Sequence, residues 1–229
     1  MIDSANPRHA LLALLLIAPI PSLGVIAAMV VAPGPVGKTI FMAAKIWLLV
    51  FPAAWYLVVE KGSLSWSPPR RGGLAAGAAS GAAIAGIIVV GAWLFGVQHM
   101  DLAPLHTEVR KMGLNMALPY LAGAAGWTFA NSLMEEYVYR WFIFRQCDIL
   151  MRGPVAVIVS AAIFTAHHVI AVSQYLDPLL TIFVSAGVFA GGVIWSWLYM
   201  RYRSIWPCWL SHVLADIAVF GVGWWLLFG

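Results

Sequence analysis

The stretch PLLTIFVSAGVFAGGVIWSWLYM, from Pro178 to Met200, contains no Asp, Glu, Lys or Arg. A helix needs roughly 20 apolar residues to cross the hydrocarbon core of a bilayer, so this run predicts a transmembrane helix. Six further runs, bounded by charged residues or by Gly and Pro, extend over Ala10–Val31, Thr39–Val59, Gly73–Val97, Leu114–Phe144, Pro154–Val172 and Ile205–Phe228. The sequence therefore predicts an all-α fold, a polytopic transmembrane helical bundle with about seven to eight spanning helices.

The composition of the whole chain indicates the same class. Of its 229 residues, 62% are apolar and 10% are charged, which leaves too little polar surface to cover a water-soluble globule. This balance excludes a disordered chain, a disulfide-stapled secreted domain and an ordinary cytosolic enzyme. The net charge of +4 comes from basic residues scattered singly between apolar runs, so we expect no nucleic-acid partner. We expect one integral membrane domain over residues 1–229.

Two of the runs have features of their own. Small residues recur four apart at Gly73, Gly77 and Gly81, a pattern that predicts close packing of this helix against another. The run that begins at Leu114 is overlong and contains Pro119, Gly123 and Gly126. We expect a break, a strong tilt or an interfacial first part there.

The distribution of Lys and Arg predicts the orientation. With a cytoplasmic N-terminus, eight basic residues face the cytoplasm, namely Arg8, Lys61, Arg70, Arg71, Arg145, Arg152, Arg201 and Arg203, and three face the other side, namely Lys38, Arg110 and Lys111. Basic residues favour the cytoplasmic side, so we expect a cytoplasmic N-terminus, in the inner (plasma) membrane of a prokaryote. Lys45 lies inside an apolar run, and we expect its ammonium group to snorkel towards the outer end of its helix.

The segment from 98 to 113 is the one connection with mixed polar chemistry. It carries His99, Asp101, His106, Glu108, Arg110 and Lys111. The spacing of its histidines and acids matches no metal-ligand pattern. We expect a solvated loop.

Ionisable groups inside membrane segments are costly and usually functional. Glu136 and Arg140 are four residues apart with the acid first, which favours an ion pair on one helix face. Glu135 is rotated about 100° away and aligns with Asn131 and Tyr139. A carboxylate without an ion partner in apolar surroundings is suited to act as a general base. A purely structural charge network accounts for Glu136 and Arg140 but leaves Glu135 unexplained.

The fifth run adds two adjacent histidines. Phe164 and His168 are four residues apart, so the phenyl ring can pack beneath the imidazole. His167 and His168 point about 100° apart along a helix. We therefore expect only His168 to meet Glu135, and His167 to be a bystander.

The last run adds His212 and Asp216, again four residues apart on one face. The carboxyl group can fix the orientation of the imidazole or act as an acid itself, and a purely structural pair is the alternative. Counting about 1.5 Å per residue from the flanking cytoplasmic charges places Glu135, His168 and His212 within about one helical turn of the same depth. The three polar sites can therefore meet inside the bundle.

In chain order these motifs are EEYVYR at Glu135–Arg140, FTAHH at Phe164–His168 and HVLAD at His212–Asp216. Together they resemble the CPBP family of intramembrane proteases, the CAAX-protease and bacteriocin-processing family, also called Abi. Its motifs are E-E-x-x-x-R, F-x-x-x-H and H-x-x-x-Asn/Asp. The resemblance covers Asn131–Phe220, and we expect residues 114–228 to carry the catalytic core.

The resemblance implies a glutamic-type intramembrane endopeptidase that needs no cofactor. Glu135 and His168 would activate a water, while His212 and Asp216 would stabilise the oxyanion. The implied supporting residues are Glu136, Arg140 and Phe164. The implied substrate is a membrane protein or peptide, cut near its C-terminus or within a membrane segment, that arrives through the lipid bilayer.

One departure from the family pattern concerns Asp216, because the prenyl-protein proteases carry Asn there. An ionised Asp cannot donate a hydrogen bond to an oxyanion. Asp216 must therefore be protonated, or must act through His212, or the family role does not transfer intact.

Three alternatives remain at this point. A metal bound by Glu135, His168 and His212 is chemically reasonable, since one carboxylate and two imidazoles suit zinc. A transporter or bacteriocin-immunity protein could use the same charges along an ion path. The absence of an inverted repeat and the single depth of the polar residues weigh against such a path. A non-catalytic scaffold would keep its activity when Glu135 is replaced.

Overall fold

A computed structural model of the chain describes residues 6–63, 65–96 and 103–229. All regular elements in the described part are helices, which confirms the predicted all-α class. Six of them are long and apolar enough to cross a membrane, namely Pro7–Val31, Pro35–Val58, Leu74–Leu94, Gly153–Val172, Pro178–Tyr202 and Ile205–Phe228. They coincide, within a few residues, with six of the seven apolar runs. The protein is an integral membrane helical bundle.

The first half of the chain contributes three of these helices. The first is divided into α1 (Pro7–Ile17), α2 (Ile20–Ile26) and the π-helix η1 (Ala27–Val31). The second is α3 (Pro35–Val58), and the third is α4 (Leu74–Gly91) with its π-helical end η2 (Ala92–Gly96).

The second half contributes α9 (Gly153–Val172), α10 (Pro178–Tyr202) and α11 (Ile205–Phe228). The sequence marks where two of them begin. The carboxylate of Asp177 accepts hydrogen bonds from the first backbone N–H groups of α10, and the hydroxyl of Ser204 accepts one at the start of α11. Such caps satisfy donors that a helix start leaves free.

The fourth run forms a series of helices instead of one regular helix. It consists of α6 (Ala117–Ala125), η3 (Gly126–Asn131), α7 (Ser132–Glu135), η4 (Glu136–Phe144) and α8 (Arg145–Leu150), where η3 and η4 are π-helical. The irregularity expected in this run is thus a pair of wide π turns, of which the first begins at Gly126. π turns are rare and often occur at functional sites.

The solvated loop expected between the third and fourth runs is partly wrong. Residues Ala103–Lys111 form a short helix, α5, whose last turn carries Arg110 and Lys111. Basic side chains there interact favourably with the negative end of the helix dipole. His99, Asp101 and the side chain of Glu108 lie outside the described residues.

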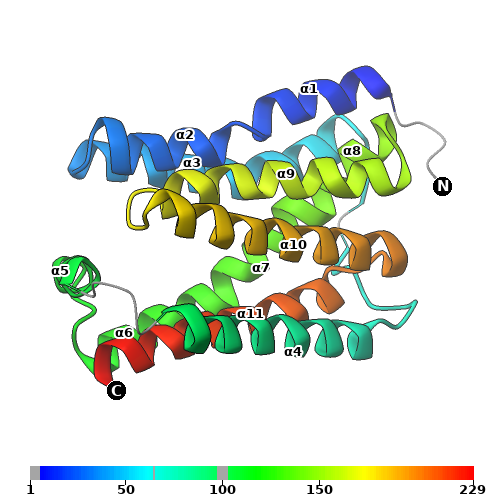
Figure 1. Cartoon of the computed structure of the whole chain (residues 1–229). Coiled ribbons are helices and arrows are strands. Elements are labelled where there is room, and N and C mark those ends of the chain that lie inside the picture. Colours follow the sequence, from blue (N-terminus) through cyan, green and yellow to red (C-terminus); the bar gives the residue numbers. More distant parts are fainter. Residues whose placement is uncertain (1–5, 64, 97–102) are drawn as a thin grey trace.

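The helices form two groups joined by the irregular run (Figure 1). Helices α4 and α11 pack side by side, and α9 packs against α10. The run from α6 to α8 crosses between the groups and contacts α11 through η3, α7 and η4, and α9 through η4 and α8. Residues of this run therefore face the histidine-bearing helices of both groups.

Small residues determine how closely α4 approaches α11. A Cβ atom added at Gly77 would lie 2.3 Å from the carbonyl oxygen of Pro207, and one at Gly81 would lie 2.8 Å from the Cα of Ser211. Any side chain at these positions would push the helices apart. The predicted small-residue packing is confirmed, and it fixes the backbone next to His212.

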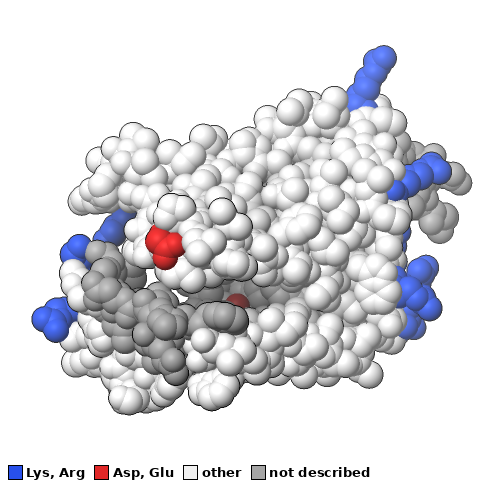
Figure 2. Space-filling model, in the orientation of Figure 1, with Lys and Arg blue, Asp and Glu red and all other residues white. Residues whose placement is uncertain are grey.

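The surface agrees with a membrane location. Figure 2 shows a broad side face with almost no charge, while lysine and arginine side chains gather at its two ends. An uncharged band bordered by basic residues is the pattern expected of a chain that crosses a bilayer.

Candidate active site

Glu135, Glu136 and Arg140 lie where α7 passes into η4, at the centre of the molecule. The structure exposes Glu135 by 7% and buries Glu136 and Arg140 completely. Arg140 Nε lies 3.4 Å from Glu136 Oε2, so the pair that the four-residue spacing predicts is present. Burying a charge is costly unless it is paired, and this pair offsets part of that cost. The three guanidinium nitrogens of Arg140 and Oε2 of Glu136 have no hydrogen-bond partner among the described residues.

Aromatic rings surround the buried guanidinium group of Arg140. Its central carbon lies 4.6 Å from the Phe164 ring and 5.2 Å from the Trp195 ring. Phe164 also lies 4.6 Å from the His168 ring. Phe164 therefore packs against both the guanidinium group of Arg140 and the ring of His168.

His212 contacts Glu136, the carboxylate that also pairs with Arg140. Its Nδ1 atom lies 2.8 Å from Glu136 Oε1, and its ring stacks on Trp195 at 4.0 Å with an interplanar angle of 16°. A carboxylate oxygen can only accept, so the Nδ1 atom carries the proton. The Nε2 atom then faces the remaining acidic groups.

Those acidic groups are Glu135 and Asp216. The Nε2 atom of His212 lies 3.7 Å from Glu135 Oε2 and 3.7 Å from Asp216 Oδ1. The buried Oδ2 atom of Asp216 has no hydrogen-bond partner. Of the readings left open for Asp216, orientation of His212 is the less favoured one, because the shorter contact to the ring comes from Glu136.

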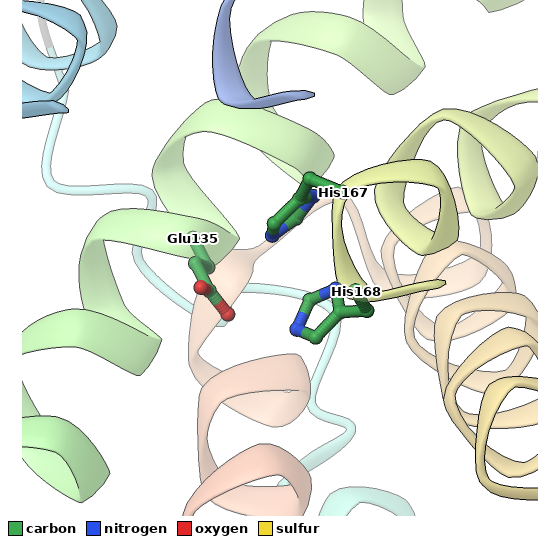
Figure 3. A group of neighbouring side chains, drawn as sticks. All are labelled: Glu135, His167 and His168. Carbon is green, nitrogen blue, oxygen red and sulfur yellow. The ribbon is translucent and has the colours of Figure 1, made fainter. Parts of the chain in front are cut away.

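Both histidines of α9 face Glu135 (Figure 3). One ligand atom each from Glu135, His167 and His168 lies within 4.8 Å of the others. The expectation that His167 is turned away is therefore wrong. Among the described residues, these three form the group whose spacing suits a metal ion. The metal site considered from the sequence contained His212 instead of His167.

The backbone fixes the tautomer of His168. Its Nδ1 atom lies 3.0 Å from the carbonyl oxygen of Phe164, and a carbonyl can only accept, so Nδ1 carries the proton. The Nε2 lone pair is then free to accept a proton or a hydrogen bond. His167 differs, since its Nδ1 atom lies 3.1 Å from the Tyr139 hydroxyl.

Lys45 also belongs to the site, although the sequence suggested that its side chain points away from it. The lysine lies near the middle of α3, and its Nζ atom donates to Asn131 Oδ1 at 2.7 Å. The expectation that it snorkels to the outer end of its helix is wrong. Trp195 was also missed, because an apolar residue in an apolar helix gives no signal in the sequence.

The structure thus brings together Glu135, His168, His212 and Asp216 from three separate helices. Residues 117–218 match a family model described as type II CAAX prenyl endopeptidase Rce1-like. This segment, which is less than half of the chain, is similar to CAAX proteases. The match includes Glu135, Glu136, Arg140, Phe164, His168, His212 and Asp216, all residues of the three motifs. No curated protein and no solved structure matches the chain.

The similarity to CAAX proteases gives the cluster a chemical context. The matching model describes endopeptidases, which are hydrolases. A carboxylate and an imidazole with a free lone pair, side by side, are groups that can take protons from a water. Opposite them, a second imidazole and a carboxyl group are possible hydrogen-bond donors.

Proposed function

We propose that the protein is an intramembrane endopeptidase of the glutamic type. In this proposal it cleaves a peptide bond of a membrane-associated protein or peptide near its C-terminus. The observation that carries the proposal is the convergence of Glu135, His168 and His212, with Glu135 Oε2 3.7 Å from His212 Nε2. A water placed between Glu135 and His168 would meet two groups able to accept its hydrogens.

The reaction begins with this water. Glu135 accepts one proton, and the Nε2 atom of His168 accepts a hydrogen bond from the other hydrogen. The oxygen attacks the peptide carbonyl, and Glu135 then passes its proton to the leaving nitrogen as the C–N bond breaks. The products are a carboxylic acid and an amine, and the remaining proton of the acid then passes to the amine, which leaves as an ammonium group beside a carboxylate.

The tetrahedral intermediate carries a negative oxygen, which needs donors. His212 supplies Nε2–H when its ring is doubly protonated, and the Glu136 carboxylate, which binds its Nδ1 atom, stabilises that state. A protonated Asp216 supplies the second donor. Glu136 and Arg140 hold His212 in place, and Phe164 packs beneath His168.

The proposal extends to the whole chain. Residues 1–229 form one membrane domain, with the catalytic core in 114–228. The excess of Lys and Arg on one side supports a cytoplasmic N-terminus, and the membrane in this proposal is the inner (plasma) membrane of a prokaryote. The substrate enters from the bilayer.

Cleavage of candidate membrane substrates tests the proposal. The wild type and the Glu135→Gln and His168→Ala variants are reconstituted in vesicles with each substrate, with and without a chelator, and products are identified by mass spectrometry. We expect loss of cleavage in both variants, by about 100-fold or more, and no chelator effect. Cleavage by Glu135→Gln at the wild-type rate overturns the mechanism. Chelator-sensitive cleavage favours a metal at the site, and cation flux without cleavage favours a transporter.

A further inference from the structure

A half-buried lysine of α3 reaches the candidate base through one amide. Lys45 Nζ donates to Asn131 Oδ1 at 2.7 Å, and Asn131 Nδ2 donates to Glu135 Oε1 at 2.9 Å. The lysine is about 15 Å from the start of α3 at Pro35. Its charge therefore lies deep in an apolar helix, where an ionisable group is costly unless it is used.

The direction of the two bonds follows from the chemistry of the groups. An ammonium group can only donate, so the amide oxygen of Asn131 faces Lys45. The amide nitrogen then faces Glu135, and an ionised carboxylate can only accept from it. These bond directions are consistent with a charged Lys45 and a charged Glu135. The amide of Asn131 lies between the two charges.

The ammonium group is also held from two further directions. It lies 5.5 Å from the centre of the Phe41 ring and 5.7 Å from that of the Trp127 ring. Both distances are within the range of cation–π attraction. Trp127 and Asn131 are four residues apart in η3, so one face of this π-helix holds the lysine head group.

The hydrogen bond from Asn131 fixes the orientation of the Glu135 carboxylate. Asn131 occupies its Oε1 atom, which leaves the Oε2 atom, the one 3.7 Å from His212 Nε2, for a reacting water. We propose that Lys45 is a positioning residue, which acts through Asn131 to hold the Glu135 carboxylate with Oε2 turned towards the reaction centre. This inference rests on the proposed endopeptidase function and adds a residue from outside the matched segment 117–218.

Removal of the lysine would act on Glu135 through the amide. The Asn131 oxygen accepts its hydrogen bond from Lys45, and the Asn131 nitrogen donates to Glu135 Oε1. Replacing Lys45 by an apolar residue removes the donor that holds the amide oxygen, so the amide and the Glu135 carboxylate are no longer fixed in this orientation.

The test compares Lys45→Met, Lys45→Arg, Asn131→Ala and the double variant Lys45→Met/Asn131→Ala with the wild type. Lys38→Met is the matched control, because Lys38 is the exposed lysine of the same helix. Initial rates on one cleaved substrate give kcat and KM separately, and thermal unfolding in the same lipid monitors folding.

We expect kcat to fall about 10-fold to 100-fold in Lys45→Met and in Asn131→Ala, with KM unchanged. The double variant should be no slower than the slower single variant, because both changes remove the same path. Lys45→Arg should recover most of the rate, since its guanidinium also donates to the amide, and Lys38→Met should match the wild type.

Each contrary result has a distinct meaning. A wild-type kcat in Lys45→Met overturns the inference while the proposed function stands. Multiplicative losses in the double variant, or a rate that falls only in step with the unfolding temperature, show a structural lysine and also overturn it. Cleavage retained by Glu135→Gln, or none by the wild type, removes the proposed function and the inference together.

Discussion

The Nδ1 atom of His212 lies 2.8 Å from Oε1 of Glu136, and the second oxygen of the same carboxylate faces Arg140. Glu136 is therefore more than the counter-ion of a buried arginine. It connects the irregular central run to α11, and it decides which nitrogen of His212 carries a proton. The histidine can then present only its Nε2 atom to Glu135 and Asp216.

Glu136→Gln should lower kcat about 100-fold, because an amide can offer its NH2 group to Nδ1 and reverse the tautomer of His212. The measurement is the rate of cleavage of the reconstituted substrate. Glu60→Gln is the matched control, since Glu60 also pairs with an arginine, Arg145, but lies away from the cluster. Equal losses in the two variants would mean that Glu136 acts only through stability.

Asp216→Asn should keep cleavage within about threefold of the wild type, whereas Asp216→Leu should lose about 100-fold. The amide can donate a hydrogen bond to the oxyanion as a protonated carboxyl group does, and leucine cannot. Rates of both variants on one substrate provide the comparison. If Asn is as damaging as Leu, Asp216 acts as an anion that supports a protonated His212.

Zinc ions should inhibit cleavage, because Glu135, His167 and His168 place three ligand atoms within 4.8 Å of one another. A zinc ion held there would occupy the position of the attacking water. His167→Ala should raise the inhibitory zinc concentration about 10-fold or more. Magnesium, which prefers oxygen ligands, is the control ion and should have little effect. Equal zinc sensitivity of His167→Ala would place the inhibitory site elsewhere.

Gly81→Ala should destabilise the fold by about 1–3 kcal/mol, since the new methyl group meets the backbone of Ser211 in α11. Gly86→Ala in the same helix is the control, because a Cβ atom there has no neighbour within 4 Å. It should be neutral or slightly stabilising. Thermal unfolding in detergent measures both. Similar unfolding temperatures for the two variants would show that α4 can move away from α11 without cost.

The membrane helices could be predicted from the sequence because each apolar run is long and ends at a charge, a proline or a glycine. Hydropathy contains no information about hydrogen bonds between helices. Lys45 was therefore placed at a helix end, although Asn131 and Glu135 are its connections to the site. No periodicity in α3 indicates that partner.

The motif residues could be predicted because they are ionisable groups four residues apart in apolar surroundings. The directions in which their side chains point were harder to predict. Helical spacing predicts that His167 and His168 diverge, but both rings turn their nitrogens towards Glu135. Rotation about side-chain bonds can offset an angle of about 100° between neighbouring positions on a helix.

The π-helical winding of η3 and η4 restricts how this stretch of chain can evolve in length. A π turn holds one residue more than an α turn, so deleting a single residue from Glu136–Phe144 would let the backbone return to the ordinary helical pattern. Everything before the deletion would then rotate relative to α8, and Glu135 would leave the histidines while Arg145 kept its place. Relatives that retain the chemistry should therefore tolerate insertions and deletions between α3 and α4, and none between Asn131 and Phe144.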